Sequence, residues 1–193
     1  MIVSHRPWIG PRFYDGLNGQ RFLLFGFSHY GFYDEGGRDD DEFTNFVMER
    51  WALKGEIPFF NAVASYFGFV DVSDFYSRVA FANTLPNSVG DSDNKFSFGD
   101  EESRSAVEGR VRKIIFDVDA DKAVVFTLKG WTLFPSYDDR DQDGILEVAE
   151  TNSIHYGGYK RKSGGYTRTF GLRHPMMAPT QKMRAVVTAI MEA

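Results

Sequence analysis

The side chains best suited to chemistry in this sequence follow three short apolar runs. Ser28, His29 and Tyr30 come after the first run. Asn83 closes the second run, and His174 follows the third. Hydroxyl, amide and imidazole groups can place a water molecule, donate hydrogen bonds to a ring and exchange protons. If the runs are parallel strands, these side chains meet at the carboxyl edge of one sheet, where α/β proteins bind ligands.

Each of these residues also has a purely structural interpretation. Ser28 and His29 can bond local backbone in the turn, and Asn83 can be a turn former. His174 and the proline after it can form a rigid exit from a strand. A hydrolase triad of Ser28, His174 and an Asp is a further alternative. Residues 26–31, however, lack the second Gly of a nucleophile elbow and the Gly-rich signatures of nucleotide-binding loops.

A separate acidic pattern matches a calcium-binding loop of the EF-hand type. It has oxygen ligands at alternating positions, a Gly for the sharp turn and a final bidentate Glu, as Ca²⁺ requires. Pro135 lies just ahead of it, and residues 153–158 leave little room for an exiting helix. We therefore expect an Asp-rich loop that is a candidate for Ca²⁺, and no other cofactor is required. The candidate ligands are Asp139, Asp141, Asp143, Glu147 and Glu150.

The charge of the chain is unevenly distributed. Its 193 residues carry a net charge of −5, so the chain as a whole is not an electrostatic nucleic-acid binder. Basic residues gather late in the sequence, where they could hold phosphates, although a solvated face is the alternative. The candidate phosphate-binding residues are Lys160, Arg161, Lys162, Arg168 and Arg173.

Composition excludes several classes of protein. The chain has no cysteine, which rules out disulfides, thiol catalysis and Cys-ligated metal sites. Hydrophobic residues make up 42%, which indicates a folded core rather than disorder. No apolar stretch reaches the roughly 18 residues of a membrane-spanning helix, and no signal peptide is evident. We expect one domain, residues 1–193, in a cytoplasmic protein with no membrane partner.

Hydrophobic periodicity predicts strands that alternate with helices. The predicted helices span residues 42–52, 58–67, 71–80, 101–117 and 180–191. The predicted buried strands span residues 21–25, 79–83, 122–128 and 170–173. Residues 154–169 look like a loop or an edge hairpin, because two Gly-Gly pairs interrupt them. This alternation predicts an α/β protein, with three α/β/α layers around a central, mostly parallel four-stranded sheet.

The ordered set of motifs resembles the uracil-DNA glycosylase superfamily. Residues 22–31, Phe-Leu-Leu-Phe-Gly-Phe-Ser-His-Tyr-Gly, are similar to its first motif, a strand that ends in a Gly-led turn. Residues 173–177, Arg-His-Pro-Met-Met, are similar to its second motif, a His-Pro pair before a loop that enters DNA. Asn83 stands where family members have a strand-end Asn. The stretch Trp8-Ile9-Gly10 and Tyr14 resemble the start of an uncharacterised bacterial branch.

The resemblance implies a uracil-DNA glycosylase-like fold and a pocket that accepts one base extruded from DNA. In an enzyme of this kind, Ser28 and His29 would place the attacking water, and His174 would donate to the departing base. The implied base-binding residues are Phe27, Tyr30 and Asn83. The implied wedge into the vacated space of the DNA is formed by Met176 and Met177.

Three positions depart from the family pattern. Ser28 stands where active members often have Asp or Asn, and Met176 replaces the usual Ser after His-Pro. Phe27 stands where the bacterial branch usually has Glu. Because Ser cannot act as an anionic base, two functions stay open. One is hydrolytic excision of a modified or deaminated base from DNA. The other is binding of a nucleobase, nucleotide or nucleic acid without catalysis; the sequence does not give the oligomeric state.

Overall fold

The computed structural model describes residues 4–29, 40–88, 101–148, 152–175 and 179–193. For residues 101–103 and 152 it describes the backbone only. Its strands are β1 (Trp8–Ile9), β2 (Phe22–Gly26), β3 (Ala80–Asn83), β4 (Lys122–Val125), β5 (Asp139–Val148), β6 (Asn152–Lys160) and β7 (Tyr166–Gly171). The helices are α1 (Phe43–Arg50), α2 (Pro58–Tyr66), α3 (Val72–Ser77), α4 (Glu101–Val118), α5 (Leu128–Trp131) and α6 (Thr180–Glu192), with a 3-10 turn η1 (Ala52–Lys54).

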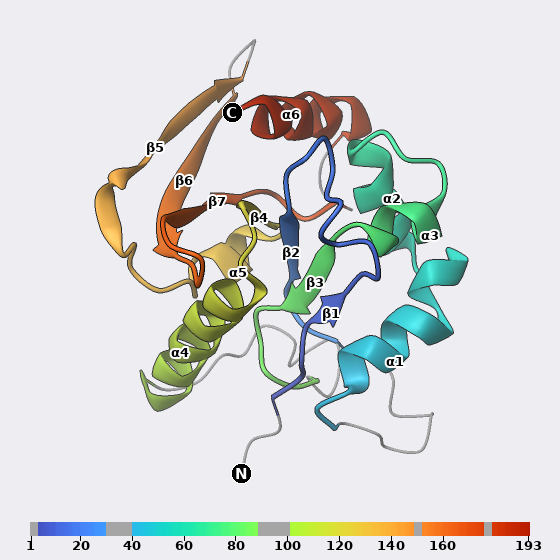
Figure 1. Cartoon of the computed structure of the whole chain (residues 1–193), viewed down its shortest axis with the longest axis horizontal. Coiled ribbons are helices and arrows are strands. Elements are labelled where there is room, and N and C mark those ends of the chain that lie inside the picture. The colour runs from blue at the N-terminus through green and yellow to red at the C-terminus, as the bar shows by residue number, and fades with distance from the viewer. Residues whose placement is uncertain (1–3, 30–39, 89–100, 149–151, 176–178) are drawn as a thin grey trace.

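The strands of the described residues form one seven-stranded sheet, in the order β1-β3-β2-β4-β7-β6-β5. The four central strands, β3, β2, β4 and β7, are parallel. The outer strands are antiparallel: β1 pairs with β3, β6 with β7 and β5 with β6. Figure 1 shows the β5–β6 hairpin reaching well beyond the central strands at one edge of the sheet. The parallel strands therefore all end at the same edge of the sheet.

The predicted α/β class is confirmed, but the predicted sheet of four strands was wrong. All four predicted strands are present with shifted ends, and β1, β5 and β6 are added to them. Residues 139–148 form a strand instead of the predicted Asp-rich loop. This strand lies at the sheet edge with exposed and half-buried residues alternating, so it lacks the apolar run that marks a buried strand. Residues 154–169 fall mainly in β6 and β7, which form the predicted hairpin with longer strands than expected.

The predicted helices are present, and their ends follow from local chemistry. The helix predicted at 71–80 begins after Asp71, whose carboxylate accepts a hydrogen bond from the Asp74 backbone N–H at 3.0 Å. It ends early because residue 80 enters β3. Likewise, the strand predicted at 122–128 ends at Val125, because Leu128 begins α5. Within the described ranges, no helix combines the length and the apolar character that a membrane crossing requires.

Helices cover both faces of the central strands (Figure 1). Along β2, Phe22 and Leu24 pack against apolar residues of α2, α3 and α6. Leu23 and Phe25 point to the opposite face, where the apolar stripe of α4 packs. Burial on both faces is typical of parallel strands, and each such side chain stabilises the fold by about 1.5–3 kcal/mol. The result is a rigid platform under the edge where the strands end.

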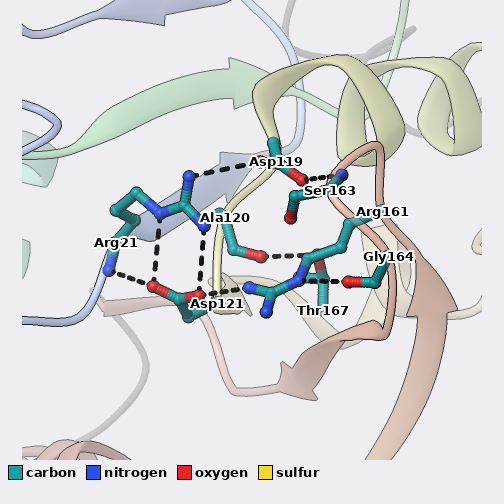
Figure 2. A network of polar contacts seen from close by, with 8 residues as sticks. All are labelled: Arg21, Asp119, Ala120, Asp121, Arg161, Ser163, Gly164 and Thr167. Atoms are coloured by element: carbon teal, nitrogen blue, oxygen red, sulfur yellow. Dashed lines mark hydrogen bonds and ion pairs between the residues drawn. The ribbon is translucent and has the colours of Figure 1, made fainter.

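The amino edge of the parallel strands is held by a polar network (Figure 2). The carboxylate of Asp121 accepts hydrogen bonds from the backbone and guanidinium of Arg21, between 2.9 and 3.3 Å, and also from Arg161. Asp119 accepts from Arg21 at 3.2 Å and from the Ser163 backbone N–H at 2.8 Å. Burial raises the pKa of Asp121, but the hydrogen bonds from Arg21 and Arg161 outweigh it and lower the pKa to about 2. This network joins β2, the end of α4 and the β6–β7 turn.

Candidate functional site

A cavity of about 340 Å³ lies at the carboxyl ends of β2 and β3. Its volume falls within the range of small-molecule sites. Five residues singled out in the sequence line this cavity together: Phe27, Ser28, His29, Asn83 and His174. The structure therefore brings together side chains from three distant segments, as the strand-end pattern predicted. Tyr30, Met176 and Met177 lie outside the described residues.

Aromatic rings form much of the cavity wall. Phe59 and Phe60 come from the first turn of α2, and Phe81 comes from β3. The Phe60 and Phe81 ring centroids lie 4.9 Å apart, and the Phe59 ring lies 5.6 Å from the His174 imidazole at an interplanar angle of 38°. The sequence predicted a helix over residues 58–67 but did not place Phe59 in the cavity. The proline at position 58 was the available signal, because it marks the helix start that brings this residue to the strand ends.

Asn83 supplies a buried polar group to the cavity. Its side chain is 3% exposed, and its Nδ2 has no hydrogen-bond partner among the described residues. Gly26 lies beside it in register on β2, and a Cβ at position 26 would overlap the Asn83 Oδ1. Gly26 is therefore required for the amide to lie against the strand. A buried donor without a partner costs about 1–3 kcal/mol, so a ligand carbonyl at this place would be favoured.

Ser28 is engaged with the backbone of its own turn. Its Oγ lies 2.8 Å from the His29 carbonyl oxygen and 3.1 Å from the Asn87 carbonyl oxygen, and it can donate its proton to either. These contacts support the turn-forming interpretation of Ser28. The oxygen still lines the cavity and can accept a hydrogen bond there, but the geometry gives no sign of an activated nucleophile.

His29 is a buried neutral imidazole. Its Nε2 lies 3.2 Å from the Thr44 Oγ1, and its ring packs against His5 and Phe43. Burial, together with the nearby charges of His5 and Arg110, lowers its pKa to about 3. Protonating such a group at pH 7 costs about 5 kcal/mol. His29 is thus a weak proton acceptor, which argues against a role as the base that activates water; the placing of a water by Ser28 and His29 stays a prediction.

His174 is positioned by α2. Its ring packs against Phe59, and the carbonyl oxygen of Pro175 accepts a hydrogen bond from the buried Tyr66 hydroxyl at 3.2 Å. Both contacts come from one helix, so the turn after β7 is fixed relative to the cavity. This placement suits an imidazole that donates to or accepts from a bound ring.

The late basic residues lie mainly at the other edge of the sheet. Lys160 is the last residue of β6, which is antiparallel to β7, and Arg161 and Lys162 follow it. Arg161 bonds to Asp121 in the amino-edge network. The guanidinium of Arg168 donates to the Ala193 carbonyl at 2.8 Å. At about 3.3 Å per residue, a five-residue strand puts this edge roughly 16 Å from the cavity. The structure therefore does not bring these four residues beside the base-sized cavity.

Arg173 is the basic candidate that does lie on the cavity side. It is exposed and immediately precedes His174. DNA binding by the basic residues stays a prediction, and Arg173 is the residue whose position agrees with it.

The candidate calcium ligands lie on a strand. Asp139, Asp141, Asp143 and Glu147 belong to β5, which pairs with β6 on both sides of an irregularity, and Glu150 lies outside the described residues. An EF-hand loop wraps its oxygens around one ion, whereas a paired strand keeps them spread. In the described part of the chain, no three or more His, Asp or Glu side chains gather as a metal site. Calcium binding stays a prediction, which calorimetry on the parent protein and Asp141→Ala would test.

Two residues behind the cavity wall carried no sequence signal. His5 is 1% exposed and packs against His29. Arg110 reaches from α4 to the end of β3. Both act through contacts between segments far apart in sequence, which periodicity does not reveal.

Comparison of the chain with family models and with curated proteins found no match.

Proposed function

We propose that this chain is a uracil-DNA glycosylase-like protein whose cavity at the ends of β2 and β3 binds one nucleobase. The observation that carries the proposal is the buried Asn83 amide in a cavity walled by phenylalanine rings, with an Nδ2 that no described residue contacts through a hydrogen bond. The Nδ2 group can donate to a ring carbonyl, as amides do when they read base edges. The aromatic walls can stack against the flat faces of the base.

The fold supports the same proposal. Four parallel strands, covered by helices on both faces, carry Ser28, Asn83 and His174 to one edge. The base would come from DNA, extruded from its stack at a cost of a few kcal/mol. Arg173, exposed beside His174, is available for a flanking phosphate. No cofactor is required for this binding.

Hydrolytic excision of the bound base is the second candidate function. The position of His174 favours it, because this imidazole lines the cavity together with Asn83. A base that leaves from its N-glycosidic bond develops negative charge, and two donors facing it would stabilise that charge. Ser28 can accept a hydrogen bond from the water, but His29 is too weakly basic to deprotonate it. The rate of excision would therefore depend more on how well the departing base carries negative charge than on activation of the water.

Labelled DNA of one sequence tests both functions. Duplexes and single strands, each with one uracil, hypoxanthine or xanthine, are compared with unmodified DNA for affinity by fluorescence anisotropy and for abasic sites by alkaline cleavage. We expect one altered base to be preferred. The preference should fall about 5- to 150-fold in Phe59→Ala, because one stacked base contributes about 1–3 kcal/mol. It should also fall in Asn83→Ala.

Phe116→Ala is the matched control, because Phe116 is 45% exposed on α4 and does not line the cavity. It should keep the preference of the parent protein. Equal affinity of the parent for all DNAs would refute base binding. A preference without abasic product would retain base binding and reject excision.

A further inference from the structure

Arg110 ties α4 to the carboxyl end of β3 and to the N-terminal segment. Its Nη1 donates to the carbonyl oxygens of Asn83 at 2.5 Å and Thr84 at 3.4 Å. Its Nη2 donates to the His5 carbonyl oxygen at 2.7 Å, and its Nε to the Ser4 Oγ at 3.0 Å. One guanidinium thus holds three segments that meet behind the cavity.

The partners of Arg110 are neutral oxygens. None of the described carboxylates forms an ion pair with it, whereas Arg21 and Arg112 each pair with an Asp. Burial lowers the pKa of Arg110 to about 10, so the group stays charged at neutral pH. Burying a cation without a counter-ion is costly unless its donors are satisfied. For Arg110, backbone carbonyl oxygens largely provide that compensation. The guanidinium and these carbonyl groups therefore hold each other in place.

These carbonyls belong to the segment that carries the base-reading amide. Thr84 follows Asn83 in the sequence and ties this segment to β2. Its backbone N–H and its Oγ1 both donate to the Gly26 carbonyl oxygen, at 3.0 and 2.9 Å. On the other side, the Asn83 carbonyl meets Arg110. The backbone of Asn83 is therefore clamped from two directions. Through His5, whose ring lies 5.6 Å from that of His29, the same guanidinium also supports a second cavity residue.

We propose that Arg110 is a positioning residue of the nucleobase cavity, which holds the end of β3 so that the Asn83 amide faces the bound ring. This inference rests on the proposed function, because the ligand of that amide is taken to be a base. The planar guanidinium serves several acceptors at once in a fixed geometry. A lysine ammonium is a single point donor on a flexible stem, so it should replace Arg110 only in part.

The test compares Arg110→Gln and Arg110→Lys with Arg112→Gln. Arg112→Gln is the control, because Arg112 lies on the same helix. Its guanidinium donates to the Asp138 carboxylate and the Ser136 carbonyl oxygen, away from Asn83. Two quantities are measured: the ¹⁵N NMR signals of the Asn83 side-chain amide, assigned through their loss in Asn83→Ala, and the ratio of affinities for DNA with the preferred altered base and unmodified DNA.

In Arg110→Gln, the Asn83 amide signals should shift or broaden, and the affinity ratio should fall about tenfold, which corresponds to one hydrogen bond of about 1.4 kcal/mol. In Arg110→Lys, both the Asn83 amide signals and the affinity ratio should lie between those of Arg110→Gln and the parent. If Arg110→Gln does not fold, Arg110→Lys is compared with Arg112→Gln in its place. Arg112→Gln should leave both quantities unchanged, even if its melting temperature falls.

The inference is overturned if Arg110→Gln and Arg112→Gln affect the Asn83 signals equally. It is also overturned if Arg110→Gln keeps the selectivity that Asn83→Ala loses. If the parent protein shows no selectivity for any altered base, the proposed function fails instead. The NMR comparison in the free protein then still decides whether Arg110 positions Asn83.

Discussion

Replacing Gly26 by Ala should displace the Asn83 amide without removing it. The new Cβ would overlap the Asn83 Oδ1 and lie 3.1 Å from the Phe81 ring, so the amide must rotate or the two strands must separate slightly. Overpacking of this kind costs about 1–3 kcal/mol, which lowers the melting temperature by about 2–12 °C in a protein of this size. Selectivity for the preferred altered base should fall about tenfold, because the Nδ2 donor leaves its place.

Gly109→Ala provides the opposite control. Gly109 lies in α4, and a Cβ built there would meet no atom within 4 Å. Alanine is favoured over glycine in a helix by about 1 kcal/mol, so this variant should melt about 2–4 °C higher and keep full selectivity. Melting is followed by circular dichroism, and selectivity by anisotropy with the DNA pair used above. If Gly26→Ala keeps the parent's melting temperature and selectivity, the close packing of Gly26 on Asn83 does not organise the cavity.

Two further predictions concern the network at the amino edge of the sheet and the turn after β7. The pKa of Asp121 is about 2 in the fold, below its ordinary value of 3.8, so its contacts with Arg21 stabilise the protein fully above pH 4 and lose this effect as the pH falls through about 2. In urea unfolding, Asp121→Asn should therefore be less stable than the parent at pH 7 and differ less at pH 2; an unchanged difference would contradict this. Tyr66→Phe removes the hydroxyl that bonds to the Pro175 carbonyl. It should cost about 1 kcal/mol and lower affinity for the preferred base by loosening His174, and unchanged affinity would mean that this hydrogen bond does not position the imidazole.

The sequence predicted the central strands and the meeting of Ser28, Asn83 and His174 at their ends, because both depend on local patterns. The run before Gly26 is apolar at every position, as a strand buried on both faces must be, and polar residues follow it. The edge strand β5 could not be predicted in this way, since its Asp-rich alternation is also the pattern of a loop. The support behind the cavity depends on long-range contacts: Arg110 and His5 are 105 positions apart in the sequence. Hydrophobic periodicity does not predict contacts between such distant residues, so only the folded structure shows that Arg110 and His5 lie together behind the cavity.

Excision by this site, if it occurs, should depend steeply on the acidity of the departing base. The cavity offers hydrogen-bond donors that stabilise negative charge, while none of its described lining residues is an Asp or a Glu that could deprotonate water. His29, with a pKa of about 3, does not replace such a base. A base that carries negative charge more readily should therefore leave faster, because its departure depends less on deprotonation of the attacking water. DNA containing 5-fluorouracil, whose fluorine withdraws electron density from the ring, should be cleaved at least tenfold faster than DNA containing uracil under single-turnover conditions. Equal rates would show that water activation limits the reaction, and a water-activating group would then have to act at this site.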